Sequence, residues 1–161
     1  ADNYAIGKEN GLLWDMPADF AYFLNTIKGH WLISGRKSFE SDQGEVVFSD
    51  PSKTIILTRQ PDYEAGDATV VNNIEMAFKV AQKAGAAKVF VLGGGEVYKQ
   101  SLPLVDTLLI TEIHAVFKEA DTFFSNFNKD NWLEIAREEH QKDDENPYNY
   151  AFVRYERKTK N

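Results

Sequence analysis

The stretch WLISGRKS, at residues 31–38, indicates the fold class of this protein. Its first half is apolar and short, which is typical of a buried strand. Gly35 then lets the chain turn, and the residues from Arg36 onward begin a short helix. A strand that passes through glycine directly into a helix is the opening of a β-α-β unit. The stretch therefore predicts an α/β fold with parallel strands.

The same alternation continues on both sides of this stretch. Apolar runs predict further strands at residues 54–58, 69–71, 88–92 and 107–113, and helical spacing predicts helices at residues 17–27, 73–85 and 96–101. Such alternation implies right-handed crossovers and a largely parallel central sheet with flanking helices. Two final strands, at residues 132–139 and 148–157, have no helix between them and predict a C-terminal antiparallel hairpin. Its polar turn at residues 143–146 is predicted to be only a solvated tip.

Length and composition limit the classes of function. The 161 residues contain neither a linker nor a repeat, so we expect one domain spanning residues 1–161. The net charge is −7 and no basic patch is visible, so we expect no nucleic-acid partner. No apolar run approaches the roughly 20 residues that span a bilayer, so we expect no membrane partner. Cysteine is absent, which fits a cytoplasmic protein, and the three histidines show no metal-ligand spacing.

Two glycine turns follow predicted strands, where α/β sheets bind their ligands. Gly35 precedes Arg36, Lys37 and Ser38, and this turn is either a phosphate site or a solvated basic turn. The triplet at residues 93–95 also joins a strand to a helix, and it either exposes N–H groups to an anion or is a flexible connector.

A third strand ends at Thr58 and Arg59. An arginine in this position could bind the 2′-phosphate that separates NADPH from NADH. Taken alone, Arg59 is better explained as an exposed arginine at the rim of the protein surface.

Asp19 is the acidic residue with the most distinctive surroundings. It lies in the first turn of the predicted helix at residues 17–27, where the helix dipole by itself favours a carboxylate. Trp14, Phe20 and Phe23 stand close to it in sequence, and aromatic neighbours would desolvate the carboxyl group and raise its pKa. The position is therefore explained either by helix-end electrostatics or by proton chemistry and amidine recognition.

Taken in order, these motifs resemble those of dihydrofolate reductases. The resemblance covers essentially the whole chain and rests on AIGKENGLLW at 5–14, WDMPADF at 14–20, GRKSFES at 35–41, GGGEVY at 93–98, LIT at 109–111 and DTFF at 121–124. It implies a cytoplasmic monomer that reduces 7,8-dihydrofolate to tetrahydrofolate with NADPH. It also implies a role in one-carbon metabolism and sensitivity to antifolates.

The resemblance also assigns roles to residues. Asp19 would bind the pterin's amino and ring N–H edge and promote protonation, Thr111 would hydrogen-bond to Asp19, and Trp14 would fix a water beside it. The other implied substrate residues are Phe20, Phe23, Ser41, Lys53 and Leu92. The implied cofactor residues are Ile6, Gly7, Asn10, Leu12, Gly35, Arg36, Lys37, Ser38, Leu57, Thr58, Arg59, Gly94, Gly95, Glu96, Val97, Tyr98 and Thr122. A cis peptide between Gly93 and Gly94 is implied as well.

The chain departs from the family pattern in two places. The family begins with a central strand about eight residues long before the point that matches Ala1, so we expect that this strand is missing here, through a fragment, unlisted residues or a rearranged chain. The segment at residues 40–53 is longer and more acidic than the family's, and it has no clear counterpart of the arginine that binds the substrate's glutamate tail. Lys53 is the best substitute, with a point charge instead of a bidentate fork.

Two alternatives to a dihydrofolate reductase stay open at this point. A related pterin-like or riboflavin-pathway reductase would explain the missing arginine, but not Asp19 and Trp14 in their signature. A non-enzymatic nucleotide-binding module would explain the missing strand. A diaminopyrimidine antifolate separates the two reductases, since it requires the Asp19 carboxylate, and turnover separates both from the binding module.

Overall fold

The computed structural model describes residues 1–159, which group into two compact units. The first, here called the terminal unit, consists of Ala1–Tyr22 and the chain from Leu102 onward, and the second, the central unit, is Phe23–Ser101. Helix α1, Pro17–Ile27, begins in the terminal unit and ends in the central unit. One domain for residues 1–161 stays a prediction.

The central unit is built on a parallel sheet whose strand order is β4-β3-β2-β5. The strands are β2 Trp31–Gly35, β3 Thr54–Leu57, β4 Thr69–Val71 and β5 Val89–Val91. Ile33 of β2 pairs with Ile55 of β3 on one side and Val91 of β5 on the other. Ile33 and Ile55 are fully buried, as expected for a parallel sheet covered on both faces. The predicted parallel strands are therefore confirmed.

Helices follow β2, β4 and β5 along the chain. They are α2 Arg36–Phe39, α3 Gly44–Val47, the short 3₁₀ helix η1 Pro51–Lys53, α4 Ile74–Lys83 and α5 Gly95–Ser101. The side chain of Asn73 accepts a hydrogen bond from the backbone N–H of Met76 at 2.8 Å and starts α4. Gly85 follows its end with a φ of +74°, so both predicted helix boundaries are explained by capping. The two short helices within residues 40–53 were not predicted.

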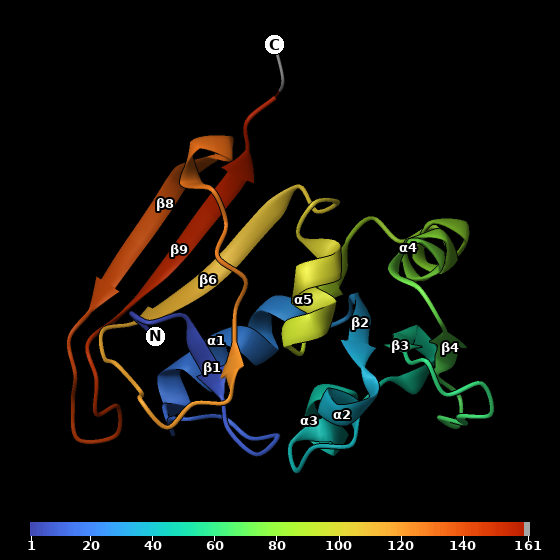
Figure 1. Cartoon of the computed structure of the whole chain (residues 1–161), viewed down its shortest axis with the longest axis horizontal. Coiled ribbons are helices and arrows are strands. Elements are labelled where there is room, and N and C mark those ends of the chain that lie inside the picture. The colour runs from blue at the N-terminus through green and yellow to red at the C-terminus, as the bar shows by residue number, and fades with distance from the viewer. Residues whose placement is uncertain (160–161) are drawn as a thin grey trace. The chain divides into compact units, whose positions relative to one another are not determined.

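The terminal unit carries an antiparallel sheet in the order β6-β9-β8, which Figure 1 shows as three long neighbouring strands. Its strands are β6 Thr107–Ile113, β8 Trp132–His140 and β9 Tyr150–Arg157. The predicted C-terminal hairpin, β8 with β9, is confirmed. Two short elements that were not predicted, β1 Ala5–Gly7 and β7 Thr122–Phe123, form a separate antiparallel pair, and η2 Lys129–Asn131 precedes β8.

Aromatic contacts hold the start of α1 against this sheet. The ring of Tyr22 stacks on that of Phe152 in β9, with centroids 3.9 Å apart and planes 14° from parallel. Met16, just before the helix, is buried in a cluster with Ile113 and Tyr150. The first turn of α1 is therefore fixed by apolar packing on the face of β6 and β9.

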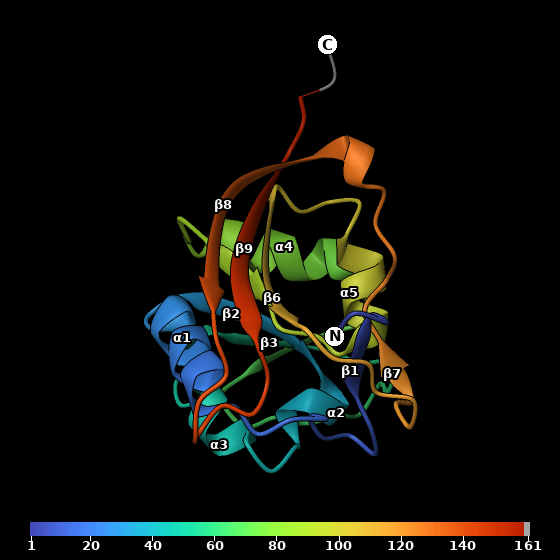
Figure 2. The same cartoon turned by 90° about the vertical axis from the view of Figure 1, so that its left-hand side faces the viewer.

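The turn between β8 and β9 differs from its prediction. Residues 143–146 were expected to be a solvated tip, but Asn146 is only 4% exposed. Its side chain reaches the start of α1, and Figure 2 shows the β8–β9 connection running beside that end of the helix. Sequence polarity did not reveal this burial, because the contact joins residues 128 positions apart.

Candidate active site

Two glycine turns meet at the carboxyl edge of the central unit's sheet. The backbone N–H of Gly35, at the end of β2, donates to the carbonyl oxygen of Gly93 at 2.7 Å. A Cβ at Gly35 would lie 3.2 Å from Cγ2 of Val97, and one at Gly94 would lie 3.5 Å from Oγ of Ser38. The two motifs are far apart in sequence but lie side by side in the structure. Without side chains at these glycines, the backbone of both turns approaches the first residues of α2 and α5 closely.

Gly93 has a backbone conformation that side chains rarely adopt. Its φ is +98°, and a Cβ there would lie 2.7 Å from Cε2 of Tyr98. The peptide between Gly93 and Gly94 is cis, as the family resemblance implied. The positive φ of Gly93 and its closeness to Tyr98 explain why glycine occupies this turn.

The remaining candidates for cofactor phosphates stand at the ends of neighbouring strands. Arg36, after β2, forms an ion pair with Glu40 at 2.7 Å. Thr58, after β3, donates its backbone N–H to the carbonyl oxygen of Val71 at 3.0 Å, and Arg59 beside it is exposed. Both basic residues therefore lie at the carboxyl ends of parallel strands, which is where a phosphate site is expected in an α/β sheet.

Four of the predicted substrate residues also lie in the central unit. Phe23 and Leu92 pack against a buried cluster that contains Leu32. The Ser41 hydroxyl donates to the carbonyl oxygen of Ser38 at 2.7 Å. The ammonium group of Lys53 donates to the carbonyl oxygen of Gly29, just after α1, at 3.3 Å.

The terminal unit holds the candidate acid. Asp19 lies in the first turn of α1, and burial raises the pKa of its carboxyl group above the ordinary value. Polar interactions with the Thr111 hydroxyl of β6 and the Trp14 indole favour the charged form and partly oppose that rise in pKa. The predicted partial desolvation of this carboxyl group is thus present in the structure.

Trp14 contributes a buried polar atom to the same place. Its indole ring packs against Phe117 with centroids 5.6 Å apart. Its Nε1 is buried and lies near enough to the Asp19 carboxyl group to act on its pKa, but it makes no hydrogen bond of full geometry to any described residue. A buried N–H beside a carboxyl group is a donor that fits a polar ligand or a bridging water.

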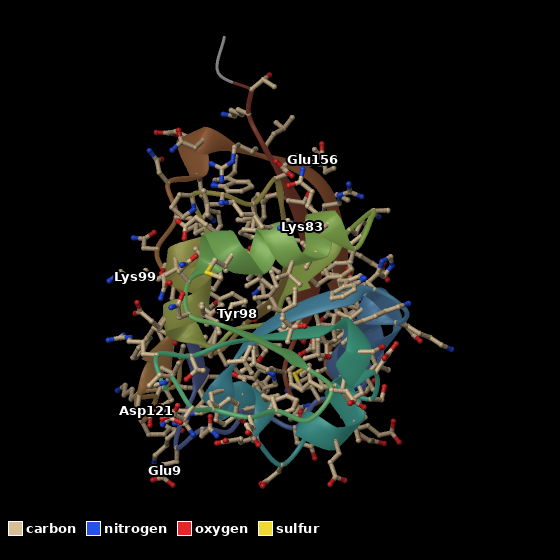
Figure 3. All side chains as sticks on the ribbon, turned by 90° about the vertical axis from the view of Figure 1, so that its right-hand side faces the viewer. Glu9, Lys83, Tyr98, Lys99, Asp121 and Glu156 are labelled. Carbon is tan, nitrogen blue, oxygen red and sulfur yellow. The ribbon has the colours of Figure 1, made fainter. Side chains whose placement is uncertain are left out.

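The loop after β1 is held in a tight turn. Lys8 and Gly11 exchange two backbone hydrogen bonds, of 3.0 and 2.9 Å, while Glu9 and Asn10 both have positive φ angles. The Asp121 carboxylate accepts a hydrogen bond of 2.8 Å from the backbone N–H of Glu9. Figure 3 labels these two residues, which lie next to each other. Asp121 therefore anchors a loop that contains two predicted cofactor residues, Asn10 and Leu12.

The predicted site residues divide between the two units. Nine lie in the terminal unit: Ile6, Gly7, Asn10, Leu12, Trp14, Asp19, Phe20, Thr111 and Thr122. Sixteen lie in the central unit: Phe23, Gly35, Arg36, Lys37, Ser38, Ser41, Lys53, Leu57, Thr58, Arg59, Leu92, Gly94, Gly95, Glu96, Val97 and Tyr98. Within the terminal unit, Asp19, Trp14 and Thr111 converge, while Leu12 stands out at 55% exposure.

Two polar residues with structural contacts to these sites were missed from sequence. Asp121 was recognised only as part of a motif, without a role, and Asn146 was placed in a solvated turn. Both act through hydrogen bonds to backbone N–H groups distant in sequence, so periodicity and composition carry no signal for them.

Membrane-spanning helices and metal clusters are both absent from residues 1–159. None of the helices in this range has the length and apolar character needed to cross a membrane. In the same part of the chain, no three His, Cys, Asp or Glu side chains gather where they could hold a metal ion.

Glycine turns at the carboxyl edge of a parallel sheet, in the central unit, and a half-buried acid, in the terminal unit, are each features found in α/β enzymes that bind nucleotides. A family model described as dihydrofolate reductase matches residues 1–157. The chain is 38% identical over 156 residues to a dihydrofolate reductase of Bacillus subtilis, covering 97% of this chain and 89% of the relative. It is 40% identical over 152 residues to the enzyme of Staphylococcus haemolyticus, covering 94% and 88%.

A solved structure agrees with these sequence matches. The dihydrofolate reductase from Enterococcus faecalis, in complex with NADP(H) and RAB-propyl, superimposes with a TM-score of 0.84 at 32% identity, covering 98% of this chain and 92% of that one. The chain belongs to the dihydrofolate reductase family.

Proposed function

We propose that this protein reduces 7,8-dihydrofolate to 5,6,7,8-tetrahydrofolate with NADPH, and that Asp19 binds the pterin and promotes its protonation. Family membership supports the reaction: the chain is an NADPH-dependent oxidoreductase of one-carbon metabolism. The observation that supports Asp19's role is its half-buried carboxyl group with a raised pKa, in the first turn of α1.

The reaction needs a hydride and a proton. NADPH, when bound, supplies hydride to a ring carbon of the pterin, and a proton from solvent is added to the neighbouring ring nitrogen. The Asp19 carboxylate can accept two parallel hydrogen bonds from the pterin's amino and ring N–H groups, which orients the ring. Because burial raises its pKa, Asp19 holds a proton more readily than an exposed aspartate does and can promote this protonation.

Thr111 and Trp14 would support Asp19. The Thr111 hydroxyl stabilises the charged form of Asp19 and so keeps its pKa from rising further. The Trp14 Nε1–H, buried without a hydrogen bond of full geometry to any described residue, is available to a water or to the substrate beside Asp19. Asp19 would make the contact with the pterin, and the other two would set its charge and hydration.

The central unit would bind the cofactor. The turns at Gly35 and Gly94 bring backbone atoms close together at one edge of the sheet, which fits the approach of a phosphate group. Arg36, Lys37 and Ser38 would contact cofactor phosphates, with Thr58 and Arg59 at the 2′-phosphate. Ile6 and Gly7 of β1, with Leu12 of the loop after it, would cover the nicotinamide, and Phe20 and Phe23 would line the slot for the pterin.

Lys53 would take over the binding of the substrate's glutamate tail. Its ammonium group has three N–H donors, of which the Gly29 carbonyl takes one. Lys53→Ala should raise KM for dihydrofolate and leave kcat unchanged, because the tail is remote from the reacting atoms. An unchanged KM would remove Lys53 from the site.

The state and location of the protein are also proposed. We infer a monomer in the cytoplasm, on the basis of family membership and of a sequence without cysteine. Sedimentation of the purified chain over a range of concentrations tests the first, and fractionation of the source cells tests the second.

Asp19→Asn tests the central claim. We expect turnover, followed as NADPH oxidation with dihydrofolate, to fall by about 10²–10⁴-fold while NADPH affinity stays unchanged. Asp15→Asn is the matched control, since Asp15 is exposed four residues earlier and should keep full activity. An Asp19→Asn enzyme as active as its parent would exclude this role. No turnover by a parent that binds NADPH would favour the related reductase with another pterin-like substrate.

A further inference from the structure

The tip of the β8–β9 hairpin is organised around one carboxylate. Oδ1 of Asp143 accepts hydrogen bonds from the backbone N–H of Glu145 at 2.9 Å and from that of Asn146 at 2.7 Å. The same oxygen accepts a third bond, of 2.9 Å, from the side-chain amide Nδ2 of Asn146. These donors hold the pKa of Asp143 below its usual range, so the carboxylate stays charged at neutral pH.

This arrangement fixes the orientation of the Asn146 amide. Because Nδ2 is bound to a carboxylate, which only accepts, the Asn146 side chain must present Oδ1 on its other side. That oxygen accepts a hydrogen bond from the backbone N–H of Ala18 at 3.0 Å. Asn146 is 4% exposed, so water cannot readily replace this contact.

Ala18 is the second residue of α1 and directly precedes Asp19. The first N–H groups of a helix have no acceptor within the helix, and Pro17 has no N–H, so Ala18 carries the first donor that needs a partner. In this protein the partner comes from a hairpin 128 residues further along the chain. The hairpin tip and the turn that carries the candidate acid are therefore joined by one buried hydrogen bond.

We propose that Asn146 is a positioning residue for the reaction: by holding the Ala18 N–H, it fixes the direction in which the Asp19 carboxylate leaves the first turn of α1. This rests on the role proposed above for Asp19. Asn146 does not touch the reacting atoms; it acts through the backbone of Ala18. Asp143 in turn orients Asn146, which makes the hairpin tip part of the support of the pterin site.

Other groups around Asp19 do not replace this contact. Thr111 of β6 and Trp14 interact with the Asp19 side chain, and the amino group of Ala1 acts on it through charge. Burial and, to a lesser extent, the Asp19 charge raise the pKa of Tyr150 of β9. These groups act on the carboxyl group itself, whereas Asn146 binds the backbone N–H of Ala18, the residue before Asp19. Loss of Asn146 should therefore change the direction of the carboxylate while its neighbours stay in place.

Asn146→Ala tests the proposal against a control from the same hairpin. In Asn149→Ala a hairpin bond is lost, because Asn149 Oδ1 accepts from the backbone N–H of Lys142 at 2.8 Å, but no bond to α1 is touched. We expect Asn146→Ala to lower kcat/KM for dihydrofolate and the affinity for a diaminopyrimidine by about tenfold or more, since small misplacements of reacting groups cost this much. NADPH affinity should stay at the parent's value in both variants.

A second pair of variants keeps the test decisive if Asn146→Ala fails to fold. Asp143→Ala leaves Asn146 in place but frees its amide, and it should lower diaminopyrimidine affinity in the same direction. Asp143→Asn keeps an acceptor oxygen and should restore it. Equal diaminopyrimidine affinity in Asp143→Ala, Asp143→Asn and the parent would overturn the proposal.

The stability and activity readouts separate the possible failures. If Asn146→Ala and Asn149→Ala lower Tm and lose activity to the same extent, Asn146 is only a hairpin residue and the proposal is wrong. If Asn146→Ala is inactive towards dihydrofolate but Asp19→Asn is fully active, the role of Asp19 is wrong. If Asp19→Asn is inactive and Asn146→Ala has parental kinetics, only the positioning role is wrong.

Discussion

The candidate ligand-binding groups of the terminal unit and of the central unit differ in their physical character. In the central unit, short turns after parallel strands expose backbone atoms, and glycine at residues 35 and 94 keeps side chains out of the way. In the terminal unit, a single carboxyl group is half-buried at a helix start, on an antiparallel sheet. The glycine turns depend on the absence of side chains, whereas the carboxyl group depends on the particular surroundings of one side chain.

This difference predicts how each unit responds to substitution. A ligand surface made of backbone at glycine turns should be sensitive to added bulk. A buried acid should be sensitive to the loss of single polar neighbours, because its pKa reflects the balance between desolvation and hydrogen bonding. Substitutions in each unit test whether the two behave independently in these ways.

Gly93→Ala should have the largest effect. The added Cβ would meet the Tyr98 ring at 2.7 Å in a residue with a φ of +98°, so the turn must shift. We expect a loss of about 3 kcal/mol in the free energy of unfolding and about 100-fold weaker NADPH binding. Denaturant titration and NADPH fluorescence titration measure these changes.

Gly66→Ala is the matched control for that variant. Gly66 has a φ of +59°, but a Cβ added there would have no neighbour within 4 Å. It should therefore show only the backbone strain, about 1 kcal/mol, with normal NADPH affinity. Equal losses of NADPH affinity in both variants would mean that contact with Tyr98 is irrelevant to the turn.

Thr111→Val should have the next largest effect, and it should be confined to the terminal unit's chemistry. Removal of the hydroxyl takes away a group that favours the charged form, so the pKa of Asp19 should rise further. We expect the pH profile of kcat to move to higher pH, because more of Asp19 keeps its proton at any given pH. Thr111→Ser keeps the hydroxyl and should retain the parental profile, whereas a common profile for both variants would contradict this role.

The raised pKa of Asp19 also makes folding stability depend on pH. Between the ordinary and the raised pKa, the folded state binds more protons than the unfolded state, so its stability falls as pH rises through that window. Asn cannot ionise, so Asp19→Asn should gain stability relative to the parent as pH rises. Paired Tm measurements from acid to neutral pH test this, and a constant difference would show that burial of Asp19 does not oppose its ionisation.

Asn73→Ala should lower stability without changing function. It removes the cap at the start of α4, which accepts from Met76 at 2.8 Å, and should cost about 1 kcal/mol of unfolding free energy. Asn73→Ser keeps a capping oxygen and should retain most of that stability. Turnover per folded molecule should equal the parent's in both, since α4 carries none of the proposed site residues.

Asp121→Ala should show the smallest effect on global stability, because the bond it removes lies at the surface. The hydrogen bond to the Glu9 N–H holds the pKa of Asp121 below its ordinary value, so the contact persists above that value and is lost as pH falls through the lowered pKa. We expect faster hydrogen exchange at Glu9 and an unchanged Tm. Asp121→Asn keeps an acceptor and should restore protection at Glu9; equal exchange in the parent and in Asp121→Ala would show that the bond does not hold the loop.

Much of the fold could be predicted from the sequence because its signals are local. The apolar run at residues 31–34 and the cap at Asn73 each specify an element through neighbouring residues. The short pair of β1 and β7 was not predicted, since three and two residues are too few to show a period. Likewise, the aromatic neighbours of Asp19 indicated its desolvation, whereas nothing near residue 146 in sequence indicated a contact with residue 18.

The sequence by itself determined the class of fold, the family and the identities of the candidate acid and glycine turns, because spacing and residue type suffice for these. The family resemblance also named Thr111 and Trp14 as neighbours of that acid, whereas the contact of Asn146 with the helix start was visible only in the tertiary structure. Thr111 reaches Asp19 because β6 passes beside the start of α1, and Asn146 reaches Ala18 because a hairpin turn folds back onto that helix. Hydrogen bonds between distant segments depend on where the chain is placed in space, and local sequence patterns do not encode that placement.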